Sequence, residues 1–303
     1  MSKLLVRSLS GVVYVALVVC SIYLGHWVDS EASDFWSRLG EWVDGEVLEL
    51  LLPWLFFSFV NVVATHEVYA NLRQHGEEVN GLMGYVAGLC LIGCFMVDSV
   101  EDFLGYTVDF LYYVLIFVLF VTPMLQMISQ LWRHDARPFA ACLYGLLPVV
   151  WVSLPLGLLL ALVYEEPDLA MMTFILVWVN DSFAYLTGRA FGRHKLWERH
   201  SPNKTWEGTI GGVVCCLVVA LALGPWFTGE SLTATTCCFW ILMGLICSVV
   251  GTLGDLVESM FKRSVGVKDS GNIMPGHGGA LDRFDSMLMI APFVYVLFLL
   301  CFD

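Results

Sequence analysis

Long apolar runs follow one another along most of the chain, and short polar stretches separate them. Nine of the runs approach or exceed the roughly 20 residues that a helix needs to cross a bilayer. They cover residues 7–25, 50–69, 82–98, 109–131, 138–163, 168–187, 209–227, 235–253 and 286–301. This pattern predicts an all-α, polytopic membrane bundle of about nine transmembrane helices. Prolines within the fifth run can kink that helix without ending it, because neighbouring helices satisfy the freed carbonyls.

Composition supports the same fold class, since 58% of the 303 residues are hydrophobic and only 14% are charged. All ten cysteines fall within apolar runs, where a thiol behaves as a small hydrophobe, so no disulfide or cysteine zinc site is indicated. The connections before about residue 168 are short, and no linker or repeat is visible. We therefore predict one continuous membrane domain, in which residues 1–168 form scaffold helices and residues 169–303 form the catalytic region.

The distribution of basic residues predicts an orientation. With nine spans and the N-terminus inside, every lysine and arginine except Arg38 falls on the inner face, which the positive-inside rule favours. The expected topology is therefore N-in and C-out. The net charge of −13 belongs mainly to the outer loops, so anionic ligands are not excluded inside. Nine of the 15 basic residues gather in two inner loops, 188–208 and 254–285.

Residues 251–264 (GTLGDLVESMFKRS) extend the eighth span with helical character. Four polar side chains stand there at i, i+3, i+4 and i+7 and share one helix face: Asp255, Glu258, Ser259 and Lys262. Two acids, a hydroxyl and an ammonium then point the same way at the inner membrane margin. The same spacing also fits a solvated stripe with a Glu258–Lys262 ion pair, and the stripe alone does not decide between the two readings.

Residues 268–286 (KDSGNIMPGHGGALDRFDS) form the most polar stretch beside an apolar run. A proline and three glycines at 274–279 exclude a helix and expose backbone N–H groups of the kind that approach phosphate oxygens. Asp282 and Asp285 follow at i and i+3, on one face of the last span's first turn, where the helix dipole favours acids. Capping explains either acid alone, but it does not require the histidine and arginine beside them.

Two aspartates from adjacent spans can supply the carboxylates of a magnesium site. Mg²⁺ in phosphoryl sites takes one or two protein carboxylates together with substrate phosphates and water, and we predict Asp255 and Asp282 as these ligands. Neighbouring lysines and arginines would neutralise a polyphosphate, and no thiol or histidine cluster competes for a softer metal. The sequence leaves open a second cation.

The third polar stretch begins at Asp181, inside the sixth span, where an ionisable residue suggests a functional site. A polar contact between helices also explains it. After the basic segment GRAFGR, Ser201 and Pro202 predict the N-cap and first residue of the next helix. Lys204 and Thr205 then fall in a first turn whose free N–H groups suit an anion. The basic loop also fits an orientation signal or a lipid headgroup contact.

Residues 259–286 closely resemble the signature of the phosphatidate cytidylyltransferases, the CDP-diacylglycerol synthases. The positions that match at the expected spacing are Ser259, Lys262, Arg263, Lys268, Asp269, Pro275, His277, Gly278, Gly279, Asp282, Arg283 and Asp285. NDSFAYLTGRAFGRHKL and SPNKTWEGTIGG resemble the family's upstream block, with Asn203 where the family often has a lysine. Together the two motifs cover about a third of the chain.

The resemblance implies an enzyme that converts CTP and phosphatidate into CDP-diacylglycerol and pyrophosphate by Mg²⁺-dependent, in-line nucleotidyl transfer. It implies that Asp255 and Asp282 bind the metal, and we expect Asp285 to support them or to hold a second cation. The expected catalytic residues are Asp255, Asp282, Asp285, Lys262 and Lys268. The expected substrate-binding residues are Asp181, Arg189, Lys204, Thr205, Ser259, Arg263, His277, Gly278, Gly279 and Arg283.

The expected site lies at the cytoplasmic face, because the motifs fall on the side that the basic residues mark as inside. A prokaryotic plasma membrane is expected because no long polar extension precedes the first span. CTP, phosphatidate and membrane lipids are the expected partners, without nucleic acid, and a homodimer is left open. One rival is a CTP-dependent polyprenol or phytol kinase, which would leave CDP; the HGGALDRFD motif argues against it. Another rival is a transporter, which would place its polar site near the bilayer midplane between internal repeats.

Overall fold

The computed structural model describes residues 3–29, 44–133, 135–229, 231, 233–273 and 278–302, with the side chains of the first helix described from Leu9 to Val28. The chain divides into two compact units. Unit 1 comprises Met1–Pro167 and Asp269–Asp282, and unit 2 comprises Asp168–Lys268 and Arg283–Asp303. The polar segment 269–282 therefore packs with the N-terminal helices.

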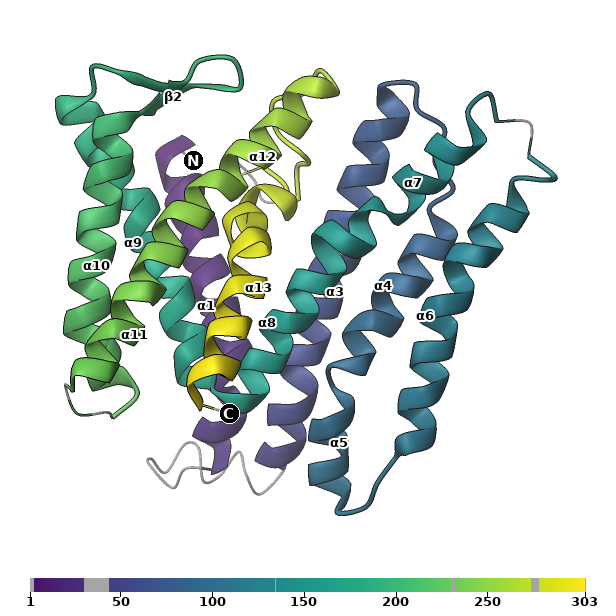
Figure 1. Ribbon diagram of the computed structural model, residues 1–303, viewed down its shortest axis with the longest axis horizontal. Coiled ribbons are helices and arrows are strands. Elements are labelled where there is room, and N and C mark those ends of the chain that lie inside the picture. Colours follow the sequence, from purple (N-terminus) through teal and green to yellow (C-terminus); the bar gives the residue numbers. More distant parts are fainter. Residues whose placement is uncertain are drawn as a thin grey trace. The chain divides into compact units, whose positions relative to one another are not determined.

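Unit 1 is built from helices (Figure 1). They are α1 (Lys3–Asp29), α3 (Gly45–Gln74), α4 (Leu82–Cys94), α5 (Val97–Leu104), α6 (Asp109–Ser129), α7 (Pro138–Pro148), the π-helical turn η1 (Val149–Ser153) and α8 (Leu154–Glu165). Small residues let the helices approach closely. A Cβ on Gly25 of α1 would overlap Glu49 of α3, and one on Gly84 of α4 would overlap the Tyr69 hydroxyl.

Unit 2 holds α9 (Pro167–Phe191) from Asp168 onward and a small β-hairpin followed by further helices (Figure 1). These elements are β1 (Lys195–Trp197), β2 (Ser201–Thr205), α10 (Trp206–Phe227), α11 (Ala234–Leu245), η2 (Ile246–Val250), α12 (Gly251–Ser264) and, from Arg283 onward, α13 (Leu281–Phe302). The ring of Phe174 on α9 meets Phe284 on α13 edge to face, with centroids 6.3 Å apart. Trp240, Met243 and Cys247 are fully buried.

The predicted fold class is confirmed. Among the described residues, eight helices are long and apolar enough to cross a membrane, and α4 with α5, bent by 45° at a short break, gives a ninth if the pair crosses as one span. The fifth span runs from Pro138 to Glu165 through both of its internal prolines. The π-helical turn η1 lies between those prolines and accommodates the backbone groups that they disturb. The orientation in the membrane stays a prediction.

The sequence prediction for the start of α10 was wrong. Ser201 and Pro202 do not open the helix; they lie in β2, which pairs antiparallel with β1. Thr205 is the N-cap instead, with extended backbone angles and a hydroxyl that accepts from the N–H of Gly208 at 3.2 Å. Pro202 can sit in this two-stranded sheet because each strand has a free edge, where no partner needs its missing N–H.

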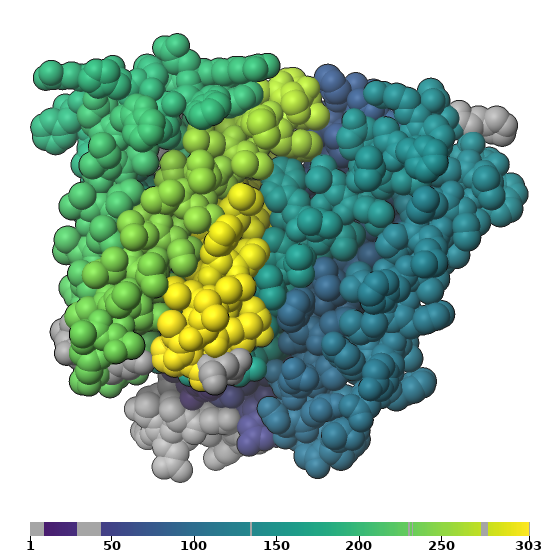
Figure 2. Space-filling view, viewed as in Figure 1, coloured from purple at the N-terminus to yellow at the C-terminus, as the bar shows by residue number. Residues whose placement is uncertain are grey.

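Helices α12 and α13 pack closely within unit 2. Figure 2 shows the yellow helix α13 lying along the yellow-green helices that lead into α12. Gly251 and Gly254 of α12 permit this approach, since a Cβ on Gly251 would meet Ile290 and one on Gly254 would meet the backbone carbonyl of Asp285. The close packing brings Asp255 and Glu258 of α12 next to Asp285 of α13.

Candidate active site

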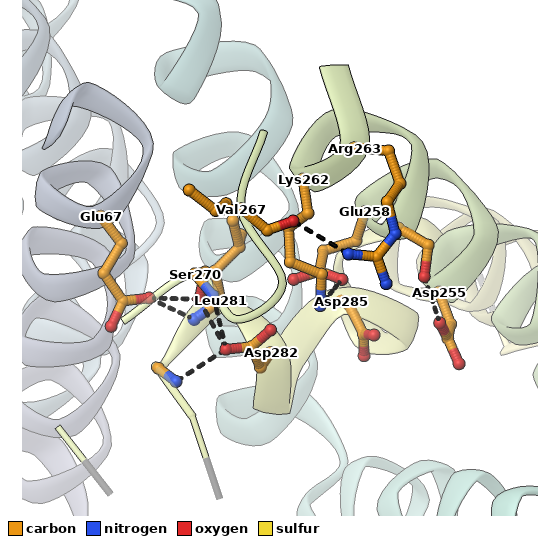
Figure 3. Close-up of polar contacts among 12 residues, drawn as sticks. Glu67, Asp255, Glu258, Lys262, Arg263, Val267, Ser270, Leu281, Asp282 and Asp285 are labelled. Carbon is orange, nitrogen blue, oxygen red and sulfur yellow. Dashed lines mark hydrogen bonds and ion pairs between the residues drawn. The ribbon is translucent and has the colours of Figure 1, made fainter. Parts of the chain in front are cut away.

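Three carboxylates converge in unit 2. Asp255 and Glu258 come from α12 and Asp285 comes from the first turns of α13 (Figure 3). One oxygen from each lies within 4.8 Å of the others, and this is the group of possible metal ligands found among the described residues. The predicted helical spacing put Asp255 and Glu258 on one face of α12, and the packing of α13 adds Asp285. We call these three residues the carboxylate cluster.

Two lysines balance the charge of the carboxylate cluster. Lys204, from β2, places its Nζ 2.7 Å from Oδ2 of Asp255 and donates to the carbonyl of Thr252 at 3.4 Å. Lys262 forms an ion pair with Glu258 at 2.5 Å, one helical turn away on α12. The side chain of Glu258 is only 1% exposed, so burial makes such pairing necessary. The Glu258–Lys262 pair that the sequence suggested therefore forms, but as part of a buried site rather than a solvated stripe.

Further predicted residues surround the same cluster. Ser259 donates to Oδ1 of Asp255 at 3.3 Å. Asp181, on α9, interacts electrostatically with Asp255, Lys204 and Arg283. The polar contact between helices that was an alternative role for Asp181 is made by its neighbour: buried Asn180 donates to the Thr252 hydroxyl at 3.5 Å. Asp181 itself is exposed.

Asp282 organises the segment that precedes it in unit 1. Its Oδ2 accepts from the backbone N–H of Ser270 at 2.9 Å, from the Ser270 hydroxyl at 2.9 Å and from the N–H of Gly279 at 2.7 Å. Gly278 has φ +83°, and a Cβ there would overlap the Asp282 carboxylate, so only glycine fits. The predicted pairing of Asp255 with Asp282 on one metal joins residues of different units and stays a prediction.

The remaining predicted residues have local partners or open surroundings. Arg263 donates to the carbonyl of Val267 at 3.0 Å, and Arg189 to the hydroxyl of Tyr185 at 3.5 Å. Lys268 is exposed. Thr205 uses its hydroxyl to cap α10, as described above. His277 lies outside the described residues.

The donor set of the carboxylate cluster fits a hard divalent cation. Its three members offer only oxygen ligands, from side chains on two neighbouring helices, and no sulfur or imidazole belongs to the group. Mg²⁺ binds such carboxylates and completes its coordination with water and phosphate oxygens. Lys204 and Lys262 leave the cluster less negative than three bare carboxylates, which suits a site that must also admit an anionic substrate.

Sequence reasoning missed two acids. Glu258 was seen on the α12 face but was not assigned to the site, because Lys262 stood at the ion-pair spacing. Glu67 was passed over in the segment HEVYANLRQ, although it lies at the end of an apolar run, where an ionisable residue suggests function by default. In the structure, Glu67 is buried and accepts hydrogen bonds from Ala280 and Leu281 (Figure 3).

Fold and site together define an integral membrane protein with a cluster of three carboxylates that could hold a cation, flanked by lysines where an apolar helix turns polar. A sequence model of the cytidylyltransferase family matches residues 46–301. Because this match covers most of the chain, the protein belongs to the cytidylyltransferase family, as its resemblance to one branch of that family predicted.

Several curated relatives carry the name phosphatidate cytidylyltransferase. The protein of Staphylococcus aureus (strain COL) is 52% identical over 129 residues, which make up 42% of this chain and 47% of the relative. The proteins of Staphylococcus haemolyticus (strain JCSC1435) and Staphylococcus saprophyticus are 49% and 48% identical over the same length and coverage. The chain thus spans about half the length of the curated relatives that it matches.

Proposed function

We propose that the protein is a phosphatidate cytidylyltransferase, which makes CDP-diacylglycerol and pyrophosphate from CTP and phosphatidate. The observation that carries the proposal is the stretch of 129 residues that is 52% identical to an enzyme of that name. The cation-binding donor set of the carboxylate cluster, with Lys204 and Lys262 beside it, is what such a reaction needs.

The proposed reaction is an in-line displacement at the α-phosphorus of CTP. A phosphate oxygen of phosphatidate forms a new bond to that phosphorus. The bond from the α-phosphorus to the oxygen that bridges to the β-phosphorus breaks, and pyrophosphate leaves with the electron pair. No covalent intermediate with the protein is needed, so catalysis consists of positioning and of neutralising charge.

Mg²⁺, when bound, supplies positive charge that neutralises the phosphate oxygens and orients the two substrates. We propose Asp255 and Asp282 as its ligands, with Asp285 and Glu258 in support. Lys204, by its ion pair with Asp255, would hold that carboxylate in one orientation. The residues that we propose bind the phosphates and neutralise the pyrophosphate leaving group are Lys262, Arg263, Lys268 and Arg283. His277, Gly278 and Gly279 would line the triphosphate, and Asp181, Arg189, Thr205 and Ser259 the rest of the substrate pocket.

We propose an N-in, C-out topology with the site at the cytoplasmic face, because that face would carry all but one of the basic residues. A bacterial plasma membrane is the proposed location, which agrees with the bacterial sources of the relatives. Residues 1–168 would then be scaffold and residues 169–303 the catalytic region. Phosphatidate would keep its acyl chains in the bilayer while its headgroup meets CTP at the polar margin.

The test is pyrophosphate release by the detergent-purified protein with CTP, phosphatidate and Mg²⁺, with the lipid product identified by mass. We expect CDP-diacylglycerol from the wild type and its loss in Asp255→Asn. The matched control is Asp109→Asn, which neutralises an exposed carboxylate in the first turn of α6 and should keep activity. A phosphorylated lipid together with CDP would favour the lipid kinase instead. No modified lipid with any divalent cation would refute the proposal and favour the transporter.

A further inference from the structure

The carboxylate of Glu67 is surrounded by donors from a distant part of the chain. Glu67 lies on α3 and is only 6% exposed. Its Oε1 accepts from the backbone N–H of Ala280 at 2.9 Å. Its Oε2 accepts from the N–H of Leu281 at 2.9 Å and from the hydroxyl of Ser270 at 3.0 Å (Figure 3). All four residues belong to unit 1.

These contacts cap helix α13 with a side chain from another helix. Ala280 and Leu281 stand at the N-terminus of α13, where backbone N–H groups have no partner within the helix and where negative charge is favourable. A buried carboxylate on a membrane-spanning helix is costly unless it is fully hydrogen-bonded. Two backbone N–H groups and a share of the Ser270 hydroxyl proton serve that need, so Glu67 and the start of α13 depend on each other.

The same network contains Asp282. The Ser270 hydroxyl lies 3.0 Å from Oε2 of Glu67 and 2.9 Å from Oδ2 of Asp282. A hydroxyl has one proton to donate, so the two carboxylates share it. Because Asp282 also accepts from the N–H groups of Ser270 and Gly279, a shift of Ser270 moves the Asp282 carboxylate.

The backbone at Gly271 and at Gly279 lies directly against the Glu67 side chain. A Cβ on either Gly271 or Gly279 would overlap the Glu67 carboxylate, so both positions require glycine for space. One helical turn after Glu67, buried Asn71 donates to the carbonyl of Ser270 at 2.9 Å. Glu67 and Asn71 of α3 thus both contact Ser270, and Glu67 also contacts Ala280 and Leu281.

We propose that Glu67 is a positioning residue for the nucleotidyl transfer, acting through Ser270 on the carboxylate of Asp282. This inference rests on the proposed function. It makes the N-terminal helices more than a scaffold, because one of them fixes a carboxylate of the polar segment. No ligand contact is assigned to Glu67 itself.

The test compares Glu67→Gln with a matched control, Glu101→Gln. Both changes keep the side-chain size, and Glu101 likewise accepts a hydrogen bond from a backbone N–H, that of Val108 at 2.7 Å, but far along the chain from the polar segment. The first measurement is hydrogen exchange of the full-length protein in detergent, without substrates. In Glu67→Gln one of the two carboxylate oxygens that accept from the N–H groups of Ala280 and Leu281 is replaced by an amide nitrogen. We therefore expect the exchange rate at 279–282 to rise about tenfold, with later turns of α13 unchanged.

The second measurement separates kcat, KM and cation dependence. In Glu67→Gln we expect kcat to fall about tenfold or more through misplacement of Asp282, the Mg²⁺ concentration for half-maximal activity to rise and the KM for phosphatidate to stay unchanged. A lower Tm with unchanged kcat per folded molecule and unchanged Mg²⁺ dependence would mean a purely structural role and would overturn the proposal. Glu101→Gln should match the wild type in both measurements.

A second variant covers the case in which Glu67→Gln does not fold. Ser270→Ala removes the shared hydroxyl and leaves both carboxylates in place, so it should also raise exchange at 279–282 and lower kcat. Unchanged exchange and kcat in Ser270→Ala would overturn the proposal. If the wild type makes no CDP-diacylglycerol at all, the proposed function is wrong. If the wild type is active and these variants keep its kcat and Mg²⁺ response, only the positioning role of Glu67 is wrong.

Discussion

Asp285→Asn should stabilise the cation-free protein while it abolishes activity. Asn keeps the shape of Asp285 and its amide oxygen can still accept from the N–H of Ser286, now at 2.7 Å from Oδ1. What the substitution removes is negative charge beside Asp255 and Glu258. The carboxylate oxygens lie within 4.8 Å of one another. At that limiting separation and an effective dielectric constant of about 20, two like charges repel by about 3.5 kcal/mol. Folding must either tolerate this repulsion or neutralise a carboxyl with a proton, and both cost stability.

The net magnitude is smaller than the bare repulsion. Lys204 and Lys262 offset part of it and solvent screens the rest, so we expect a cost of about 1 to 2 kcal/mol. Without divalent cations, Asp285→Asn should therefore raise Tm by about 2 to 8 °C. Mg²⁺ at about 100 times its Kd should stabilise the wild type by about 2.7 kcal/mol and the variant much less. The order of the two Tm values should reverse when Mg²⁺ is added.

The assay is thermal unfolding of both proteins in detergent, with EDTA and with a series of Mg²⁺ concentrations, alongside pyrophosphate release. Activity of Asp285→Asn should fall by at least about 100-fold. Mutation of a residue that only hydrogen-bonds to a metal ligand already costs about 10- to 100-fold, and Asp285 belongs to the carboxylate cluster itself. Asp109→Asn should keep both the wild-type Mg²⁺ response and activity. A variant that is less stable than the wild type in EDTA, or that responds equally to Mg²⁺, would refute this reasoning about the carboxylate cluster.

Three further substitutions test single contacts. Lys204→Met keeps most of the length of the side chain but removes the ion pair with Asp255. Activity should fall by about 10- to 100-fold and the KM for CTP should rise. Unchanged kinetics would exclude Lys204 from the site. Thr205→Ala should lower stability by about 1 kcal/mol through loss of the cap of α10, whereas Thr205→Ser should restore it; Tm decides. Gly279→Ala should destabilise by about 1 to 3 kcal/mol, because its Cβ displaces the Glu67 carboxylate; a wild-type Tm would contradict the packing.

The long apolar runs alone predicted the membrane-spanning helices, because a helix that crosses a bilayer needs such a run regardless of how the helices pack. The helical spacing of Asp255, Glu258 and Lys262 was also readable, since it depends only on the pitch of one helix. The hairpin at 195–205 was not predicted. Its strands are short, and the N-cap signal of Thr205 competed with that of Ser201, which looks equally good in sequence.

The sequence by itself determined that this is a helical membrane protein with nine of its 15 basic residues gathered in two loops, 188–208 and 254–285, because hydropathy and the order of residues along the chain are local properties. The family resemblance grouped Asp285 with Asp255, but only the tertiary structure placed Glu258 with them, through close packing at Gly251 and Gly254. Only the tertiary structure revealed that Glu67 holds residues more than two hundred positions later in the chain. Such contacts are decided by how helices pack, which no local pattern records.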